Sequence, residues 1–440
     1  MQLESEHRVS PQHATVSARA RLRSVFVGSV GNLVEWYDFY AYAAFSLYFA
    51  GHFFPEGDEL AQQLSAALVF AFGFLVRPLG GFLFGRMADQ RGRRRALTVS
   101  VLLMCFGSLL IAITPGYAEI GHAAPAMLVL ARVIQGLSLG GEYGASATYL
   151  SEVADPARRG FWSSFQYVTL LGGQLLAIVV LLVLQSWLLD EAQLKAWGWR
   201  IPFALGAAFA LVATLMRRDL HESAEFVALE GSSRHESSLR ALARYPREVA
   251  IVVGLTAGGT AAFYTYTTYM QKFLKLSVGL SARETTLVTA ASLMFAMLLQ
   301  PLYGALSDRI GRKALLITFG ALGTLFTVPL LSAIQHTRSP LAALGLLCAA
   351  WIIVSGYTSI NAVVKAELFP ARVRATGVGL PYAITVSIFG GSAESVALAF
   401  KQAGHEHWFY WYLTGCIALS LLVYSSMRDT RRVSAMSGEE

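Results

Sequence analysis

Charged residues are scarce in this chain: 14% of its 440 residues are Asp, Glu, Lys or Arg, whereas 55% are hydrophobic. A soluble domain averages about 25% charged residues. The apolar residues also form long blocks, such as 97–113, 203–216, 314–331 and 341–354. Helices of about this length cross a hydrocarbon core of roughly 30 Å. The composition therefore argues against a soluble protein and predicts a membrane protein.

Other absences narrow the class of membrane protein. The apolar blocks lack the period-two alternation of barrel strands, which predicts helices. Cys105, Cys348 and Cys416 lie far apart in apolar blocks, so packing is expected and a disulfide framework is not. The nine histidines fall in tails or predicted loops, which argues against a metal- or haem-bearing enzyme. No phosphate-binding loop is evident, so nucleotide-driven transport is not expected, and no cofactor is expected either. No removable signal peptide is evident in the first 24 residues.

Twelve transmembrane helices are predicted, which makes the fold class all-α. They lie near 25–50, 62–84, 97–114, 125–150, 161–186, 200–216, 249–274, 285–306, 314–333, 341–366, 376–400 and 408–427. The polar stretch 217–248 predicts a linker between an N-terminal half, 25–216, and a C-terminal half, 249–427. The segments 1–24 and 428–440 are predicted tails.

The basic residues predict the orientation of these helices. Of the 35 lysines and arginines, 25 fall in the tails and the predicted loops on the side of the tails, and only 5 fall on the opposite side. Cytoplasmic loops carry such an excess. Both termini are therefore expected in the cytoplasm, and the basic pI of about 9.3 reflects topology rather than nucleic-acid binding.

A ten-residue signature occurs twice, at 85–94 and at 304–313, 219 residues apart. Its recurring positions are Gly85, Asp89, Gly92, Arg93 and Arg94 in the first copy, and Gly304, Asp308, Gly311, Arg312 and Lys313 in the second. A looser pair, 152–160 and 367–377, follows in the same order. Two ordered repeats at nearly one offset indicate a duplicated six-helix unit.

The signature predicts a conformational latch. Its glycines permit tight turns and close helix approach. Its Asp can cap a helix or pair with the arginines, and such contacts would break and re-form as the two halves rock. The alternative is that the arginines only anchor the loops at the membrane surface.

The duplicated signature resembles that of the major facilitator superfamily. Segments 31–40, 77–81, 132–144 and 197–203 are similar to its metabolite:proton symporter branch, which carries 2-oxoglutarate, citrate, shikimate and proline or betaine. Segments 164–167, 263–272, 365–370 and 389–394 look most like the 2-oxoglutarate carriers of that branch. The resemblance implies two pseudo-symmetric six-helix halves in the inner membrane that import a dicarboxylate by proton symport with alternating access.

Ionisable residues inside predicted helices are the candidate functional groups, because each costs about 2.5–3.5 kcal/mol to insert at mid-bilayer. Proton coupling is expected from the carboxylates Glu35, Asp38, Glu142 and Glu394. Substrate binding is expected from Arg77, Arg132 and Lys365, and from the hydrogen-bonding side chains of Gln166, Tyr167 and Tyr264. The resemblance singles out Lys365 for the oxoglutarate-like carriers. Lys272 is counted among the cations that lie in or at the ends of predicted helices, and it is assigned no role.

Each of these roles has a plainer alternative. Glu35, Asp38 and Arg132 could pair with one another for packing alone, and Lys365 could extend toward the membrane surface. Among function classes, a membrane sensor would need a large soluble domain, and an enzyme would need a metal cluster or a nucleophile. The sequence therefore favours a monomeric carrier of a small organic anion and protons, with citrate, shikimate, proline or betaine as rival substrates.

Overall fold

The computed structural model describes residues 18–55, 57–91, 93–140, 142–216 and 242–436, and the described part is almost entirely helical. The longer helices of the first half are α1 (Ala18–Phe53), α2 (Glu59–Leu75), α3 (Arg77–Arg91), α4 (Arg93–Ile113), α6 (Ala123–Leu139), α7 (Glu142–Val153), α9 (Phe165–Val183) and α11 (Ile201–Met216). Shorter elements join them: α5 (Tyr117–Ile120), η1 (Pro156–Arg158), α8 (Arg159–Ser163), η2 (Leu184–Leu188), α10 (Glu191–Ala196) and η3 (Gly198–Arg200).

The second half has the same plan. Its longer helices are α14 (Pro246–Tyr264), α16 (Ala282–Ile310), α17 (Arg312–His336), α18 (Pro340–Thr358), α20 (Ala371–Thr385), α21 (Ala393–Gln402) and α22 (Glu406–Ser426). Shorter pieces are η5 (Thr265–Tyr269), α15 (Met270–Phe273), η6 (Leu274–Val278), α19 (Asn361–Glu367) and η7 (Val386–Gly390). The elements η2, η5, η6 and η7 are π-helical turns.

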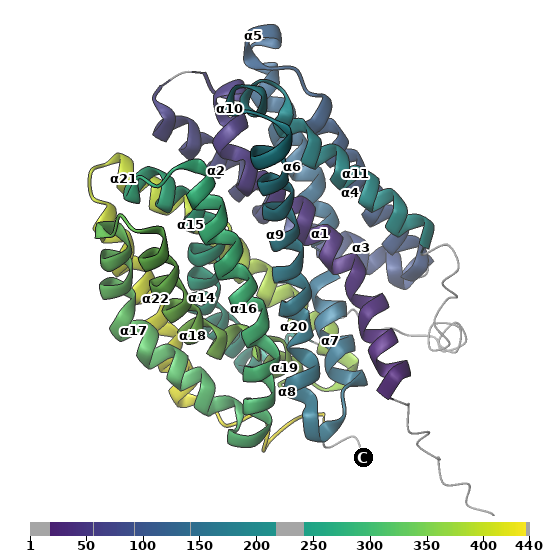
Figure 1. Ribbon diagram of the computed structural model, residues 1–440. Helices are drawn as coiled ribbons and strands as arrows, with labels where there is room; N and C mark the ends of the chain where they lie inside the picture. Colours follow the sequence, from purple (N-terminus) through teal and green to yellow (C-terminus); the bar gives the residue numbers. More distant parts are fainter. Residues whose placement is uncertain (1–17, 56, 92, 141, 217–241, 437–440) are drawn as a thin grey trace, which may run out of the picture.

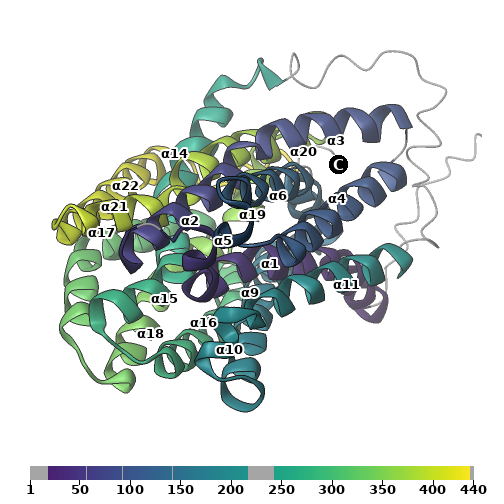
Figure 2. The same cartoon turned by 90° about the horizontal axis from the view of Figure 1, so that it is seen from above.

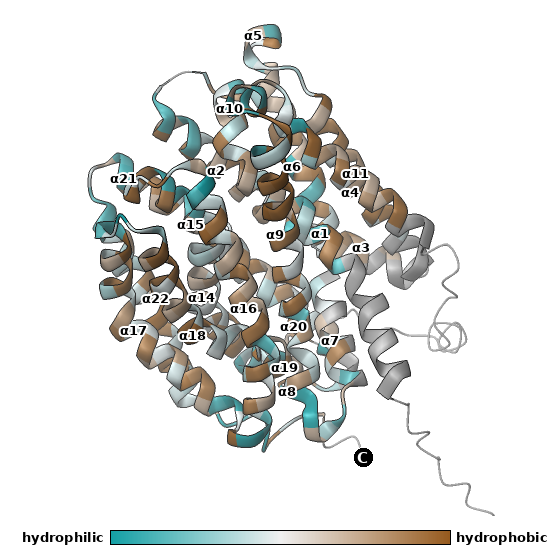
Figure 3. Ribbon diagram, viewed as in Figure 1, coloured by the Kyte–Doolittle hydropathy of each residue, from teal (hydrophilic) through white to brown (hydrophobic). Residues whose placement is uncertain are grey.

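The described helices account for the twelve membrane crossings that the sequence predicts. Eight spans are long and apolar enough to cross a membrane by length and composition, and three shorter apolar helices accompany them within the described residues. The remaining crossing is α1, whose apolar run is interrupted by Glu35 and Asp38. Large apolar side chains such as Leu302, Leu325 and Leu422 are 65–69% exposed on the outer faces of the helices, where lipid would cover them. Figure 3 shows these apolar outer faces.

Each half is a bundle of helices, and the two bundles lie side by side (Figures 1 and 2). In the first half α1 packs on α9 and α11, and α4 packs on α6 and α11. In the second half α14 and α17 pack on α22. The halves meet where α16 packs on α8 and α9, where α20 packs on α3 and α7, and where α2 packs on α21. Figure 1 places α5 and α10 at one end of the molecule and α8 and α19 near the other, which is the end of the repeated signature.

Several helix boundaries differ from the sequence prediction. Helix α1 begins at Ala18, inside the predicted tail 1–24, and the predicted helices 62–84, 341–366 and 376–400 are each divided into shorter helices. The second signature copy is not a loop: α16 continues to Ile310, and only Gly311 separates it from α17, because Gly311 adopts a φ of 96° that L side chains rarely take. The predicted helix 125–150 is two helices, α6 and α7. Helix α14 begins at Pro246, inside the predicted linker, and the part of that linker at 217–241 lies outside the described residues.

Candidate functional site

An aromatic layer fills the centre of the interface between the halves. Tyr143 of α7 stacks on Tyr382 of α20, with ring centroids 3.6 Å apart. Tyr167 of α9 lies edge-on to Phe263 of α14, and Phe263 is followed by Tyr264. We call these five residues the central aromatic layer. All five residues lie on helices that face the other half. Both halves therefore contribute side chains to the layer, and either half can move away from the side chains of the other.

Lys365 of α19 borders this layer from the second half. Its ammonium lies 3.8 Å from the centroid of the Tyr382 ring and donates a hydrogen bond of 3.1 Å to the Tyr143 hydroxyl. The Tyr143 hydroxyl in turn donates to Asn361 at 2.9 Å. Lys365 is fully buried, and within the described residues it forms no ion pair. A buried ammonium held by rings and one hydroxyl has the capacity to bind an anion.

Arg77, the first residue of α3, borders the same layer from the first half. Its guanidinium carbon lies 3.8 Å from the centroid of the Phe74 ring, and its charge faces the hydroxyl of Tyr264. Within the described part of the chain, its buried Nε and Nη2 have no hydrogen-bond partner. Two buried cations, Arg77 and Lys365, therefore lie on either side of one aromatic layer.

Asp38 belongs to a buried polar network inside the first half. It accepts hydrogen bonds from the Ser108 hydroxyl and, at 2.6 Å, from the Gln135 amide. Gln135 also accepts a 2.8 Å hydrogen bond from Arg132. The guanidinium carbon of Arg132 lies 4.1 Å from the centroid of the Phe39 ring. Among the described residues, Asp38 and Arg132 are linked by hydrogen bonds through Gln135 and form no direct ion pair. A carboxylate in such a network is charged or neutral according to its hydrogen-bond partners.

The other predicted residues have varied positions. Glu35 is buried on α1, within electrostatic reach of Arg77. Gln166 is buried on α9, where its backbone carbonyl accepts a hydrogen bond from Asn32. Glu142 begins α7, and its side chain lies outside the described residues.

Glu394 of α21 is paired with Lys272 of α15, a partner that was not predicted from the sequence. The two charged atoms are 2.5 Å apart, and the side chains are only 2% and 1% exposed. Lys272 also donates to the backbone carbonyl of Ala43 in the first half at 3.2 Å. By contrast the pair Glu191–Lys195, in a connection between spans, is exposed, and there the neighbouring ammonium lowers the pKa of Glu191. The rule that intramembrane charges are functional would have identified Lys272 from the sequence.

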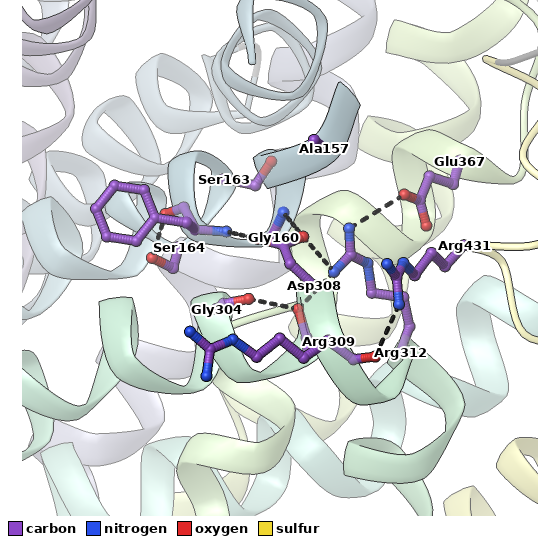
Figure 4. Close-up of polar contacts among 12 residues, drawn as sticks. Ala157, Gly160, Ser163, Ser164, Gly304, Asp308, Arg309, Arg312, Glu367 and Arg431 are labelled. Carbon is purple, nitrogen blue, oxygen red and sulfur yellow. Dashed lines mark hydrogen bonds and ion pairs between the residues drawn. The ribbon is translucent and has the colours of Figure 1, made fainter. Parts of the chain in front are cut away.

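The second signature copy lies against the first half (Figure 4). The Asp308 carboxylate accepts hydrogen bonds from the backbone N–H groups of Gly160 and Phe161 at 2.8 and 2.9 Å, which caps the start of α8. Arg312 donates to the same carboxylate at 2.8 Å and lies 3.6 Å from Glu367. One carboxylate on α16 thereby joins the two halves of the molecule.

Two glycines permit this contact. A Cβ atom on Gly160 would lie 2.5 Å from the carbonyl oxygen of Gly304, and a Cβ atom on Gly304 would lie 2.5 Å from the carbonyl oxygen of Gly160. Any larger residue at either position would therefore separate the backbones of α8 and α16. In the first copy, Gly92 lies outside the described residues, as do the side chains of Asp89, Arg93 and Arg94, and Gly85 lies within α3.

A second ion pair joins the halves at the same end. Arg374 of α20 donates to Glu152 of α7 at 2.7 Å. Both residues belong to the looser of the two sequence repeats, for which no role was predicted from the sequence. The repeated signature therefore predicted only some of the contacts that join the two halves at this end of the molecule.

The opposite end of the molecule is also closed by contacts between the halves. The Tyr40 hydroxyl of α1 donates to the carbonyl of Thr267 at 2.8 Å. The Thr286 hydroxyl of α16 lies 3.3 Å from the Gln185 amide oxygen of η2. The two halves are therefore in contact at both ends of the described bundle.

Two family descriptions match the chain. The description "Sugar (and other) transporter" matches residues 24–248, and "Major Facilitator Superfamily" matches residues 260–435. The chain is 54% identical to the alpha-ketoglutarate permease of Escherichia coli (strain K12), over 92% of this chain and 93% of that protein. It is 34% identical to a citrate-proton symporter of Klebsiella pneumoniae, over 86% and 85%.

Solved structures share the fold at low sequence identity. The xylose transporter XylE from E. coli, in a partially occluded inward open conformation, superposes with a TM-score of 0.71 at 20% identity, covering 93% of this chain and 98% of that one. The proton:xylose symporter XylE bound to 6-bromo-6-deoxy-D-glucose gives a TM-score of 0.72 at 20% identity, over 96% and 99%.

Proposed function

Because the chain belongs to the major facilitator superfamily of membrane transporters, we propose that it imports a small dicarboxylate, 2-oxoglutarate, by proton symport. It is a transporter and not an enzyme. The observation that carries the choice of substrate is the pair of buried cations, Arg77 and Lys365, at the central aromatic layer. The name of the alpha-ketoglutarate permease, 54% identical, agrees with this choice.

The charges explain why a dicarboxylate fits better than a zwitterion. Arginine's planar fork suits a carboxylate, and a lysine ammonium is a compact second cation. A zwitterion such as proline or betaine would bring its own positive charge to Arg77 or Lys365, which would repel it. We assign one carboxylate of the substrate to each cation, with Tyr167 and Tyr264 as hydrogen-bonding neighbours.

Protons supply the driving force in this proposal. Import of a dianion with two protons moves no net charge, and each further charge moved through 100 mV contributes about 2.3 kcal/mol. The buried Asp38, held by Ser108 and Gln135, is the leading proton-coupling carboxylate. Arg132 acts through Gln135 in this scheme, so it tunes Asp38 rather than binding substrate.

Alternating access requires the contacts at one end to open while those at the other end stay closed. We propose that the halves 25–216 and 249–427 are the moving bodies and that Asp308, Arg312 and Gly304 form the latch at the cytoplasmic end. The basic residues on that side support cytoplasmic termini in the inner membrane. Since one chain supplies both halves of the path, the transport unit is a monomer.

Uptake of radiolabelled 2-oxoglutarate into proteoliposomes with an acidic exterior tests the function. We expect uptake in the parent that collapses when a protonophore is added. Lys365→Gln should lower uptake at least tenfold, because losing a buried charged partner costs about 2–5 kcal/mol of binding. Lys401→Gln is the matched control and should keep parental uptake, since Lys401 pairs with Glu406 outside the central layer.

Uptake of the rival substrates distinguishes 2-oxoglutarate from the alternatives. Accumulation of citrate, shikimate or proline in the same vesicles, with no uptake of 2-oxoglutarate, would overturn the substrate. Uptake of 2-oxoglutarate that persists with the protonophore would overturn proton coupling.

A further inference from the structure

The buried pair Lys272–Glu394 has the properties of a two-state element. With its atoms 2.5 Å apart and both side chains almost completely buried, it is a complete ion pair in a low-dielectric site. Removing one charge from such a pair leaves the other uncompensated, which is strongly unfavourable. The pair is therefore stable when both groups are charged, and it is lost when either is neutralised.

The pair is connected to the other half of the molecule. Lys272 donates to the Ala43 carbonyl of α1 at 3.2 Å, and about one turn earlier on both helices Tyr40 donates to the Thr267 carbonyl. These contacts join α1 to the η5–α15 segment, at the end opposite the Asp308 latch. As long as the Lys272 ammonium is paired with the Glu394 carboxylate, it also stays in contact with α1.

The local backbone favours rearrangement at this place. Lys272 lies on the four-residue helix α15, which has the π-helical turns η5 and η6 on either side. Glu394 follows the π-helical turn η7 by a few residues. Such turns often occur at functional sites in helices.

One carboxylate oxygen of Glu394 is available to accept a proton. Its Oε2 is buried and has no hydrogen-bond partner within the described residues. The charged and titratable groups that face Glu394 come from three neighbouring segments: Lys272, Arg132, Tyr40, Tyr42 and Tyr269. Arg132 links this carboxylate electrostatically to the Asp38 network of the first half.

From this geometry we propose that Lys272 and Glu394 form the charged gate at the outer end of the transport path, and that protonation of Glu394 opens it. The inference rests on the proposed proton symport. A proton from the outer side binds Glu394 Oε2 and forms a neutral carboxylic acid, so Lys272 loses its counter-ion and releases α1. Loss of the same proton restores the carboxylate and closes the gate.

Accessibility of a single cysteine tests the gate. Thr286→Cys is the reporter in a background where Cys105, Cys348 and Cys416 are replaced by serine, because Thr286 is buried against Gln185 of the other half. The reconstituted full-length protein is labelled from outside with a membrane-impermeant maleimide. The labelling rate is measured between pH 5.5 and 8 and corrected for the reactivity of an exposed thiol.

We expect the parent to label faster as the pH falls. Glu394→Gln should label several-fold faster than the parent at pH 8 and lose the pH dependence, because its side chain is permanently neutral. Lys272→Gln should also label faster. Lys401→Gln is the matched control with a Lys–Glu pair inside the second half, and it should behave as the parent.

Labelling of Glu394→Gln and Lys272→Gln at the parental rate would overturn the gate. If Glu394→Gln is not monodisperse after purification, the labelling rate of Lys272→Gln decides whether the gate exists. Exchange of internal for external 2-oxoglutarate by the parent is measured separately. Failure of that exchange overturns the proposed substrate, whereas the labelling rates decide the gate without any substrate.

Discussion

The Asp38 carboxylate illustrates what single residues determine in this protein. Its acidic character and its place inside the first helix follow from the sequence, and so does the expectation that it exchanges protons. Its partners Ser108 and Gln135 come from α4 and α6, and nothing in the local sequence of α1 identifies them. The same holds for Glu394, whose partner Lys272 is more than a hundred residues away.

Gly206 of α11 gives a test of the Asp38 network. A Cβ atom at this position would lie 2.3 Å from Asp38 Oδ1, so Gly206→Ala should displace the carboxylate from Ser108 and Gln135. We expect proton-driven accumulation of 2-oxoglutarate to fall several-fold, while exchange across the membrane is retained. Both activities are measured in the same proteoliposomes.

Gly415→Ala is the control for this substitution, because a Cβ atom there meets nothing within 4 Å. It should leave both activities unchanged. Accumulation by Gly206→Ala equal to that of Gly415→Ala would contradict the proposed role of the Asp38 network.

At the scale of elements, the junction between α16 and α17 shows how a short motif acts through its geometry. Gly311 allows the chain to turn within one residue, which sets Asp308 and Arg312 side by side. The carboxylate then caps α8, a five-residue helix of the other half. A short helix depends on such a cap because its first N–H groups have no partner within the helix.

Asp308→Ala should weaken the closed state at this end. Loss of a helix cap costs about 1 kcal/mol, which corresponds to a shift of roughly fivefold in the population of the closed state. The expected result is faster maleimide labelling of Ser164→Cys, a buried residue next to Gly304, from the side that we propose is cytoplasmic.

The matched control removes the cap of a different helix. Asp58→Ala deletes the hydrogen bond to Ala61 at the start of α2, which lies away from the Asp308 contacts. It should leave the labelling of Ser164→Cys unchanged. A similar acceleration in both variants would mean that general loosening, and not the latch, exposes the cysteine.

At the scale of the whole molecule, contacts close the interface at both ends. Tyr40 and Thr286 contact the other half at one end, and Asp308 and Arg374 do so at the other. A carrier that works by alternating access must break one of these sets in each half-cycle. Fixing either set should therefore stop transport without unfolding the protein.

A cross-link between the halves tests this requirement. Glu152 and Arg374 form an ion pair of 2.7 Å across the interface, so cysteines at both positions are within reach of a short reducible cross-linker. We expect cross-linking to abolish uptake and a reductant to restore it. A cross-link between cysteines at Lys401 and Glu406, both in the second half, should leave most of the uptake intact. Uptake that continues in the fully cross-linked Glu152/Arg374 variant would contradict rocking of the two halves.

The sequence by itself determined the helical membrane fold, the duplicated halves and the identity of the intramembrane charges. These properties follow from apolar run length, repeat spacing and residue chemistry, which are all local. The tertiary structure alone decided that Lys365 faces Tyr382, that Asp308 caps α8 and that Lys272 pairs with Glu394. Each of these contacts joins helices that are distant in sequence, and their meeting depends on how the two bundles pack against each other.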